Sequence, residues 1–148
     1  MKTLNNFYYI RLMPLHEKHP VLLFDGVCNL CNNAVKFIIR HDKKNQFLFA
    51  SIQSDAAKKL LLHHNYKNNN MDSVLLLDQG KLYDKSKAVL VICRHLGFPW
   101  KLFIPLGSLP RSWLDAMYDF VARNRYRWFG KKKVCTLELP EHKNRFIR

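Results

Sequence analysis

The chain has 148 residues, a length that fits one ordinary domain, and 48% of them are hydrophobic, a fraction that excludes a disordered chain. It carries 25 Lys and Arg against 11 Asp and Glu, and the resulting net charge of +14 favours polyanions, acidic partners or anionic membrane surfaces. No stretch approaches the ~18 consecutive apolar residues of a membrane-spanning helix. Because the first residues also lack the apolar core of a signal peptide, the sequence predicts a cytoplasmic protein.

The first half of the chain predicts alternating strands and helices. The apolar run HPVLLFDG at 19–26 predicts a buried strand, and from Asn29 the apolar residues follow a helical period as far as the polar stretch 40–45. QFLFASI at 46–52 alternates as a strand does. Residues 54–66 then predict a helix with a Ser or Asp cap and one apolar stripe.

The second half predicts a hairpin followed by helices. Residues 73–86 contain two strand-like runs joined by Asp-Gln-Gly-Lys, and SKAVLVICRHLG at 86–97 predicts a helix with a serine cap and a terminal glycine. Three prolines make 98–113 irregular or short-helical. Residues 111–130 predict a long amphipathic helix that Gly130 ends, and the basic tail from Lys131 is predicted to be loosely structured.

This order of elements predicts a fold. A strand–helix–strand connection implies a parallel pair, and the hairpin adds an antiparallel edge. The result is an α/β domain of thioredoxin-like type, with a small mixed sheet flanked by helices and extra C-terminal helices. We place this domain at residues 20–136, between an N-terminal extension of unassigned role (1–19) and a basic C-terminal tail (137–148).

Cys28 and Cys31 form a C-x-x-C pair where the first predicted strand meets the first predicted helix. Disulfide exchange needs a thiolate that attacks and a second thiol that resolves the mixed disulfide. Cys28 is expected to be accessible at the helix N-terminus, where backbone N–H groups stabilise an anion, and Cys31 to be more buried one turn later. We therefore predict a redox-active dithiol that needs no cofactor, since its electrons come from another dithiol.

Other interpretations of the cysteines are weaker or come from another class of protein. The pair could simply pack at a helix start. A closed zinc site needs four ligands, but Cys93 and Cys135 are isolated, and the neighbouring His63 and His64 point to different faces. We predict Cys93 to be a core residue and Cys135 an idle thiol rather than a third redox thiol. The alternative function is a basic module that binds nucleic acid or an anionic surface and has structural cysteines.

A phosphatase interpretation of the same stretch fails on its chemistry. LLFDGV resembles the start of haloacid-dehalogenase phosphatases, which need two aspartates separated by one residue. If Asp25 is the second aspartate of the pair, Leu23 stands in the first position. If Asp25 is the first, Val27 stands in the second position. One carboxylate is therefore missing.

Two charged features have open roles. Asp25 could take up the proton of Cys31 during resolution, or it could end the strand and cap the following turn. Arg123, Arg125 and Arg127 cannot share one helix face because they are spaced by two. We favour a helix end at which these arginines satisfy carbonyls and acidic neighbours, over a basic surface for an anionic partner or an arginine beside the sulfurs.

The sequence resembles a known family over about residues 20–136. DGVCNLC at 25–31, SKAVLVICRHLG at 86–97, IPLGSLPRSWLDAMYDFVARNRYRWFG at 104–130 and Cys135 resemble the DCC family of thiol-disulfide oxidoreductases. The family's Asp-x-x-Cys-x-x-Cys motif maps onto Asp25, Cys28 and Cys31.

The resemblance implies a thioredoxin-like fold and a redox role toward an unidentified dithiol or disulfide protein, or a small thiol. One feature of thioredoxins is missing. Met71 or Asp72 stands where thioredoxins have a cis-proline before the third strand, which argues against the binding of an extended polypeptide.

Overall fold

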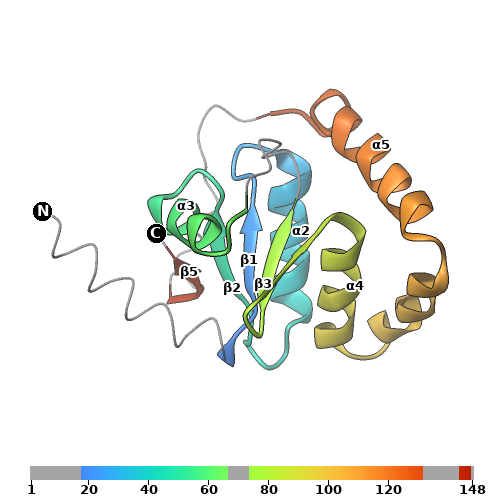
Figure 1. Cartoon of the computed structure of the whole chain (residues 1–148), viewed down its shortest axis with the longest axis horizontal. Helices are drawn as coiled ribbons and strands as arrows, with labels where there is room; N and C mark the ends of the chain where they lie inside the picture. Colours follow the sequence, from blue (N-terminus) through green and yellow to red (C-terminus); the bar gives the residue numbers. More distant parts are fainter. Residues whose placement is uncertain (1–17, 67–73, 132–143, 148) are drawn as a thin grey trace, which may run out of the picture.

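The computed structural model of the chain describes residues 18–66, 74–131 and 144–147. Five strands of this part form one sheet in the order β4-β3-β1-β2-β5, with helices on both faces (Figure 1). The strands are β1 (Val21–Phe24), β2 (Leu48–Ser51), β3 (Leu75–Asp78), β4 (Lys81–Asp84) and β5 (Phe146–Ile147). The helices are α2 (Asn29–His41), α3 (Asp55–His63), α4 (Lys85–Leu96), the 3-10 helix η1 (Trp100–Ser108) and α5 (Arg111–Phe129).

The strand pairing confirms the predicted fold. β1 and β2 are parallel, in the register that pairs Val21 with Leu48, and α2 connects them. β3 runs antiparallel to β1, and β4 runs antiparallel to β3. The parallel pair with a helical crossover and the antiparallel hairpin beside it form the mixed sheet of a thioredoxin-like fold, as the order of elements predicted.

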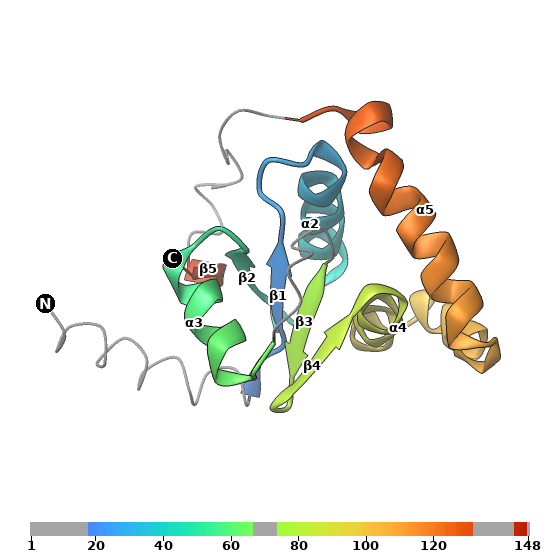
Figure 2. The same ribbon diagram turned by 45° about the horizontal axis from the view of Figure 1, so that its top comes forward.

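Side chains of β1 alternate between the two halves of the core, because successive residues of a strand point to opposite faces. Leu22 and Phe24 pack in the layer under α2 and α4. Val21 and Leu23 pack in the layer under α3. Figure 2 shows the same arrangement, with α3 on one side of the sheet and α2 with α4 on the other. β1 is fully buried and lies in the middle of the sheet. The cysteine pair follows shortly after the carboxyl end of this strand.

Local signals set several boundaries as predicted. Ser54 caps α3, because its hydroxyl accepts the N–H of Ala57. Gln79 and Gly80 both have positive φ and form the two-residue turn of the β3–β4 hairpin. The serine cap predicted for α4 is wrong. Ser86 lies inside α4 and donates its hydroxyl to Asp115 at 2.5 Å, because the helix already begins after Asp84.

η1 and α5 lie outside the two sheet layers. η1 packs on α4, and α5 contacts both α4 and α2, so that the pair forms an arm at one edge of the molecule (Figure 1). No residue of η1 is buried, and Arg125 is the buried residue of α5. The arm therefore adds little to the core, but it brings a charged side chain from the end of α5 to the start of α2.

The end of the chain is more ordered than the sequence predicted. Within the range interpreted as a basic tail, β5 pairs in parallel with β2 at the edge of the sheet. Arg145 holds it in place, since its Nη2 lies 2.5 Å from Asp42 Oδ2 and its Nε donates to the carbonyl of Phe47 at 3.1 Å. A strand of two residues has no alternating pattern, so its position depends on these contacts. Met71, Asp72, Cys135 and residues 1–17 lie outside the described residues.

Candidate redox site

The cysteine pair lies at the carboxyl end of β1 and the beginning of α2, as predicted. Cys28 is the N-cap residue of α2, with extended φ and ψ, and its carbonyl accepts the first helical N–H, from Asn32, at 3.0 Å. The N–H of Cys28 donates to the carbonyl of Asp25 at 3.2 Å, which closes the turn between strand and helix. No acidic residue occupies the first turn of α2, so the positive end of the helix dipole faces the cysteines without a local carboxylate from that turn.

Both sulfurs are enclosed, which corrects the prediction that Cys28 is accessible. Cys28 is 0% exposed and Cys31 is 5% exposed. The end of α5 and the residues after it lie against the start of α2: Asn29 Nδ2 donates to the carbonyl of Phe129 at 2.8 Å, and the backbone of Cys28 forms a β-bridge with Lys131. We call residues 129–131 the strap. The strap comes from a part of the chain about a hundred residues away, so the local sequence around the motif gave no sign of it.

Gly130 lets the strap pass this close. Its φ of +81° lies in the left-handed region that favours glycine, and a Cβ added there would meet Asn29 Nδ2 at 3.2 Å. Its carbonyl also accepts the backbone N–H of Asn29, at 3.4 Å. The glycine that ends α5 therefore also fits the strap against the start of α2.

Arg125 is the charged residue nearest the sulfurs. It is 3% exposed at its side chain, and its Nη1 lies 3.6 Å from the Sγ of Cys31. Its Nη2 donates to Asp25 Oδ2 at 3.2 Å and to the hydroxyl of Tyr126 at 3.1 Å. Burial alone would lower the pKa of this guanidinium, but the acidic groups around it, Cys31 first among them, raise it, so it remains a cation. Arg125 thus lies beside a sulfur, as one alternative allowed. The favoured interpretation also holds in part, because Arg125 satisfies an acidic neighbour, Asp25, and Arg123 donates to the carbonyl of Asp119 at 3.3 Å.

Asp25 lies at the centre of a buried polar cluster. One oxygen, Oδ1, accepts the N–H of Val27 at 3.2 Å and the amide of Gln53 at 2.8 Å. The other, Oδ2, accepts from Arg125 and from the hydroxyl of Tyr126. Asp25 therefore does stabilise the turn after β1, as one of the two predicted roles requires, and it also holds the guanidinium beside Cys31. Gln53 and Tyr126 were not predicted, because their approach depends on how β2 and α5 pack.

The thiol of Cys31 is a weak acid in its buried position. Burial, above all, raises the pKa of the Cys31 thiol to about 12, and the charge of Cys28 and a hydrogen bond between the two thiols raise it further. Arg125 acts in the opposite direction and lowers it. Cys28, Cys31 and Cys93 are all free cysteines. Cys31 therefore keeps its proton until a positive charge stabilises its thiolate.

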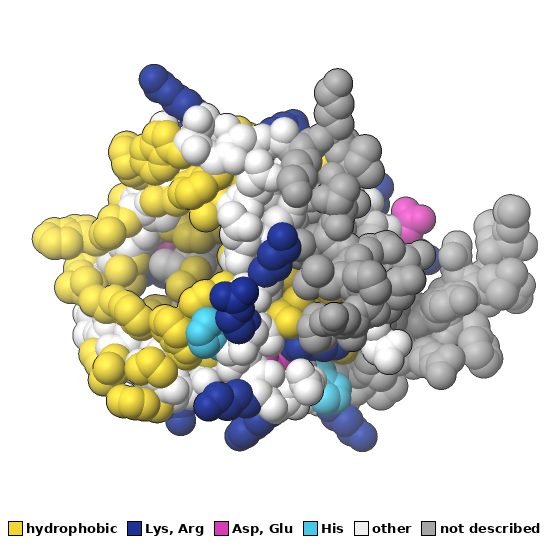
Figure 3. Space-filling model, turned by 180° about the vertical axis from the view of Figure 1, so that it is seen from behind, with side chains coloured by type: hydrophobic (Ala, Val, Ile, Leu, Met, Phe, Trp, Pro, Cys, Tyr) yellow, Lys and Arg dark blue, Asp and Glu magenta, His cyan; other side chains and the backbone are white. Residues whose placement is uncertain are grey.

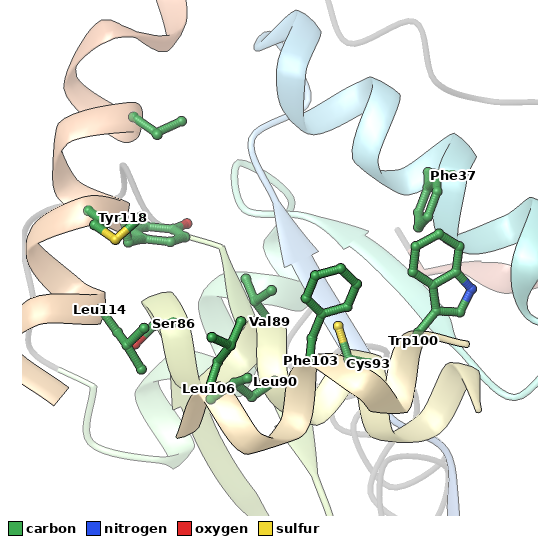
Figure 4. A pocket seen from close by; sticks show the side chains of 12 residues that line it. Phe37, Ser86, Val89, Leu90, Cys93, Trp100, Phe103, Leu106, Leu114 and Tyr118 are labelled. Carbon is green, nitrogen blue, oxygen red and sulfur yellow. The ribbon is translucent and has the colours of Figure 1, made fainter. Parts of the chain in front are cut away.

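An apolar cavity lies behind Cys31. An inner chamber of about 190 Å³ has Cys31, Phe24, Val35 and Ile38 in its wall. A wider groove of about 500 Å³ lies beside it, between α2, α4, η1 and α5. Phe37, Trp100 and Cys93 border both spaces, and Figure 4 shows these side chains gathered around the groove together with Phe103 and Tyr118. Cys93, predicted to be a core residue, is only partly buried.

Metal ligands do not gather in the described part of the chain. Among residues 18–66, 74–131 and 144–147, no group of three or more His, Cys, Asp or Glu side chains is placed to hold a metal ion. No helix of these residues is long and apolar enough to cross a membrane.

Comparison with known proteins gives the family. Residues 22–131 match the DCC1-like thiol-disulfide oxidoreductase family. The chain belongs to this family. It is 45% identical over 127 residues to the uncharacterized protein YuxK of Bacillus subtilis strain 168, covering 86% of this chain and 93% of that protein. It is also 42% identical over 122 residues to a chloroplastic DCC family protein of Arabidopsis thaliana, covering 82% of this chain and 71% of that protein.

No solved structure matches the chain. The family resemblance that the motif Asp25, Cys28 and Cys31 suggested is thus confirmed by the match over most of the chain. A relative assigned to the chloroplast stands beside the bacterial one, so membership of the family does not fix a compartment.

Proposed function

We propose that this protein is a thiol-disulfide oxidoreductase that uses Cys28 and Cys31. The Cys28 thiolate attacks one sulfur of a substrate disulfide, which forms a mixed disulfide and releases the first substrate thiolate. Cys31 then gives up its proton and attacks the Cys28 sulfur, which releases the second substrate thiolate and leaves a Cys28–Cys31 disulfide. The substrate gains two electrons and the dithiol loses two. An external dithiol returns the protein to its reduced form.

The observation that carries this proposal is the buried cation beside the second sulfur. A thiol pair that only packs in the core does not need a guanidinium 3.6 Å from Cys31, held there by a buried carboxylate. The Cys31 thiol, with its pKa of about 12, is a poor nucleophile until a positive charge stabilises its thiolate. Arg125 is positioned to supply that charge during resolution.

Asp25 has a positioning role in this scheme, and in our proposal it also takes up the proton of Cys31. It shares the Arg125 guanidinium with that sulfur and is itself buried. Proton uptake by a positioned carboxylate is general-base catalysis. The helix N-terminus at Cys28 stabilises the attacking thiolate, as a helix dipole does for an anion at its N-terminal end.

The test is the reduction of a small aromatic disulfide, followed by the colour of the thiol that it releases. Cys28→Ser should abolish exchange, and Cys31→Ser should stop after the first step with a mixed disulfide on Cys28. Cys93→Ser is the matched control, because Cys93 is free and lies outside the pair, and it should retain full activity. Full exchange by Cys28→Ser, with a normal circular dichroism spectrum, would overturn the proposal.

A cytoplasmic location is part of this proposal. A reducing compartment keeps a dithiol reduced and supplies the second dithiol that the cycle needs.

A further inference from the structure

The arm formed by η1 and α5 exposes an apolar surface. Large hydrophobic side chains follow one another along it, and Figure 3 shows such side chains gathered on one side of the molecule. We call this set the arm face; it consists of Leu102, Phe103, Ile104, Leu106, Leu109, Trp113, Met117, Phe120, Val121, Trp128 and Phe129. In the rest of the described chain, the exposed large hydrophobic residues are Phe37, Leu62, Val89 and Phe98. A continuous exposed apolar surface of this kind marks an interaction site in most soluble proteins.

The outer side of α5 carries the most exposed part of the arm face. Trp113, Met117, Phe120 and Trp128 recur at spacings of four, three and eight residues, which places them along one side of a helix. Trp113 is 67% exposed and Met117 is 69% exposed. Arg125 faces the sulfurs and Tyr118 lines the groove, and Met117 lies at the border between the stripe and the groove, since it lines the groove as well. The apolar stripe is therefore separate from the residues that serve the redox site.

The charges around the arm face are positive. Lys101, Arg123 and Arg127 are exposed on the same arm, and Lys131 is exposed in the strap that follows it. The two acidic residues of α5 are neutralised by neighbours: Asp115 pairs with Arg111 at 3.2 Å, and Asp119 pairs with Lys85 at 3.0 Å. Together with the net charge of +14 of the whole chain, the arm face combines apolar side chains with a basic rim.

We propose that the arm face docks on the surface of a membrane rich in anionic lipid. Exposed Trp, Phe and Leu side chains insert into the boundary between headgroups and acyl chains, and basic residues at the rim bind lipid phosphates, as in other interfacial helices. Docking of this kind needs no membrane-spanning helix, and the described residues contain none.

Two other occupants fit less well. A nucleic acid would use the basic rim, but it offers no apolar surface for a face dominated by aliphatic and aromatic side chains. A second copy of this chain would cover the apolar stripe, but it would bring together two chains of charge +14. An anionic bilayer satisfies both the apolar side chains and the charge.

The experiment measures binding of the full chain to two kinds of vesicle. One contains phosphatidylcholine and phosphatidylglycerol in equal amounts, and the other contains phosphatidylcholine alone. We expect cosedimentation with the anionic vesicles and a blue shift of tryptophan emission, because Trp113 and Trp128 enter a less polar environment. Trp113→Gln combined with Met117→Gln should lower the partition coefficient at least about tenfold. Arg127→Gln should lower it about fivefold.

Matched controls keep the result specific. Leu62→Gln removes a side chain that is 75% exposed on α3, away from the arm, and Lys58→Gln removes an exposed charge of the same helix. Both should leave vesicle binding unchanged. Cys28→Ser should also leave it unchanged, so a failure of the redox proposal is distinguishable from a failure of this one. The arm-face double variant should in turn retain disulfide exchange in solution.

Three results would overturn the proposal. The first is equal binding of the wild type and the double variant to anionic vesicles. The second is self-association of the wild type without lipid, seen by sedimentation velocity and abolished in the double variant, which would make the arm face an interface between copies. The third is binding to single-stranded RNA in preference to vesicles, lost in Arg127→Gln and kept in the double variant, which would assign the basic rim to nucleic acid.

Discussion

Replacing Arg125 with methionine tests whether the buried charge pair organises the redox site. The change keeps an unbranched side chain but removes the cation that faces Asp25 at 3.2 Å, and both side chains are almost fully buried. Breaking a buried pair by removing one partner costs about 3–5 kcal/mol. Asp25 keeps its bonds to Val27 and Gln53, so we expect the lower end, about 3 kcal/mol.

The assay is thermal and urea unfolding under reducing conditions. For a chain of this length, about 3 kcal/mol corresponds to a fall in Tm of roughly 6–12 °C. Arg127→Met is the matched control, because Arg127 is exposed on the same helix, and it should change stability by less than about 0.5 kcal/mol. Adding Asp25→Asn to Arg125→Met should recover part of the loss, since no buried carboxylate is then left without its cation. An effect of Arg125→Met no larger than that of Arg127→Met would refute the reasoning.

Two further predictions concern the thiols and the strap. Burial raises the pKa of Cys31 from 9.0 to about 12, so its proton stabilises the fold fully below pH 9, and this stabilisation is lost between pH 9 and pH 12. Between pH 9 and pH 12, the free energy of unfolding in urea should fall with pH more steeply for the wild type than for Cys31→Ala, by up to about 1.4 kcal/mol per pH unit. Equal slopes of the two proteins would contradict this prediction. Gly130→Ala and Gly80→Ala both place alanine at positive φ and should each cost about 1 kcal/mol, but only Gly130→Ala crowds Asn29 and should speed alkylation of Cys28. Equal alkylation rates in the two variants would show that the strap does not protect Cys28.

The sequence predicted those parts of the fold that local signals determine. The buried run of β1, the existence of β2 and the Ser54 cap of α3 are all readable within a few residues, and their order predicts the parallel pair. The alternation predicted for β2 is wrong, because three successive residues of this strand are buried. The cap of α4 could not be placed, because Ser86 and Asp84 are both residue types that favour caps and the helix began at the earlier one. β5 has only two residues and depends on the contacts of Arg145, so no sequence pattern predicts this strand.

The site was predicted in its chemistry but not in its enclosure. The spacing of Cys28 and Cys31 at a helix start was readable directly from the sequence. That Cys28 is covered, and that Arg125 rather than Arg123 or Arg127 turns inward, depends on how α5 packs across α2. The spacing of two shows that the three arginines point to different sides of α5. Only the tertiary contact with Asp25 determines which of them is buried.

The most direct test of the proposed redox role is a redox titration of the full chain in glutathione buffers, read by mass spectrometry of its peptides after alkylation. We predict a single two-electron transition in which Cys28 and Cys31 become linked to each other, while Cys93 stays alkylatable throughout. Arg125→Met should shift the midpoint of this transition, and Arg127→Met should not. A titration in which Cys28 and Cys31 remain thiols, or in which each takes up glutathione without forming the intramolecular disulfide, would contradict the proposed function.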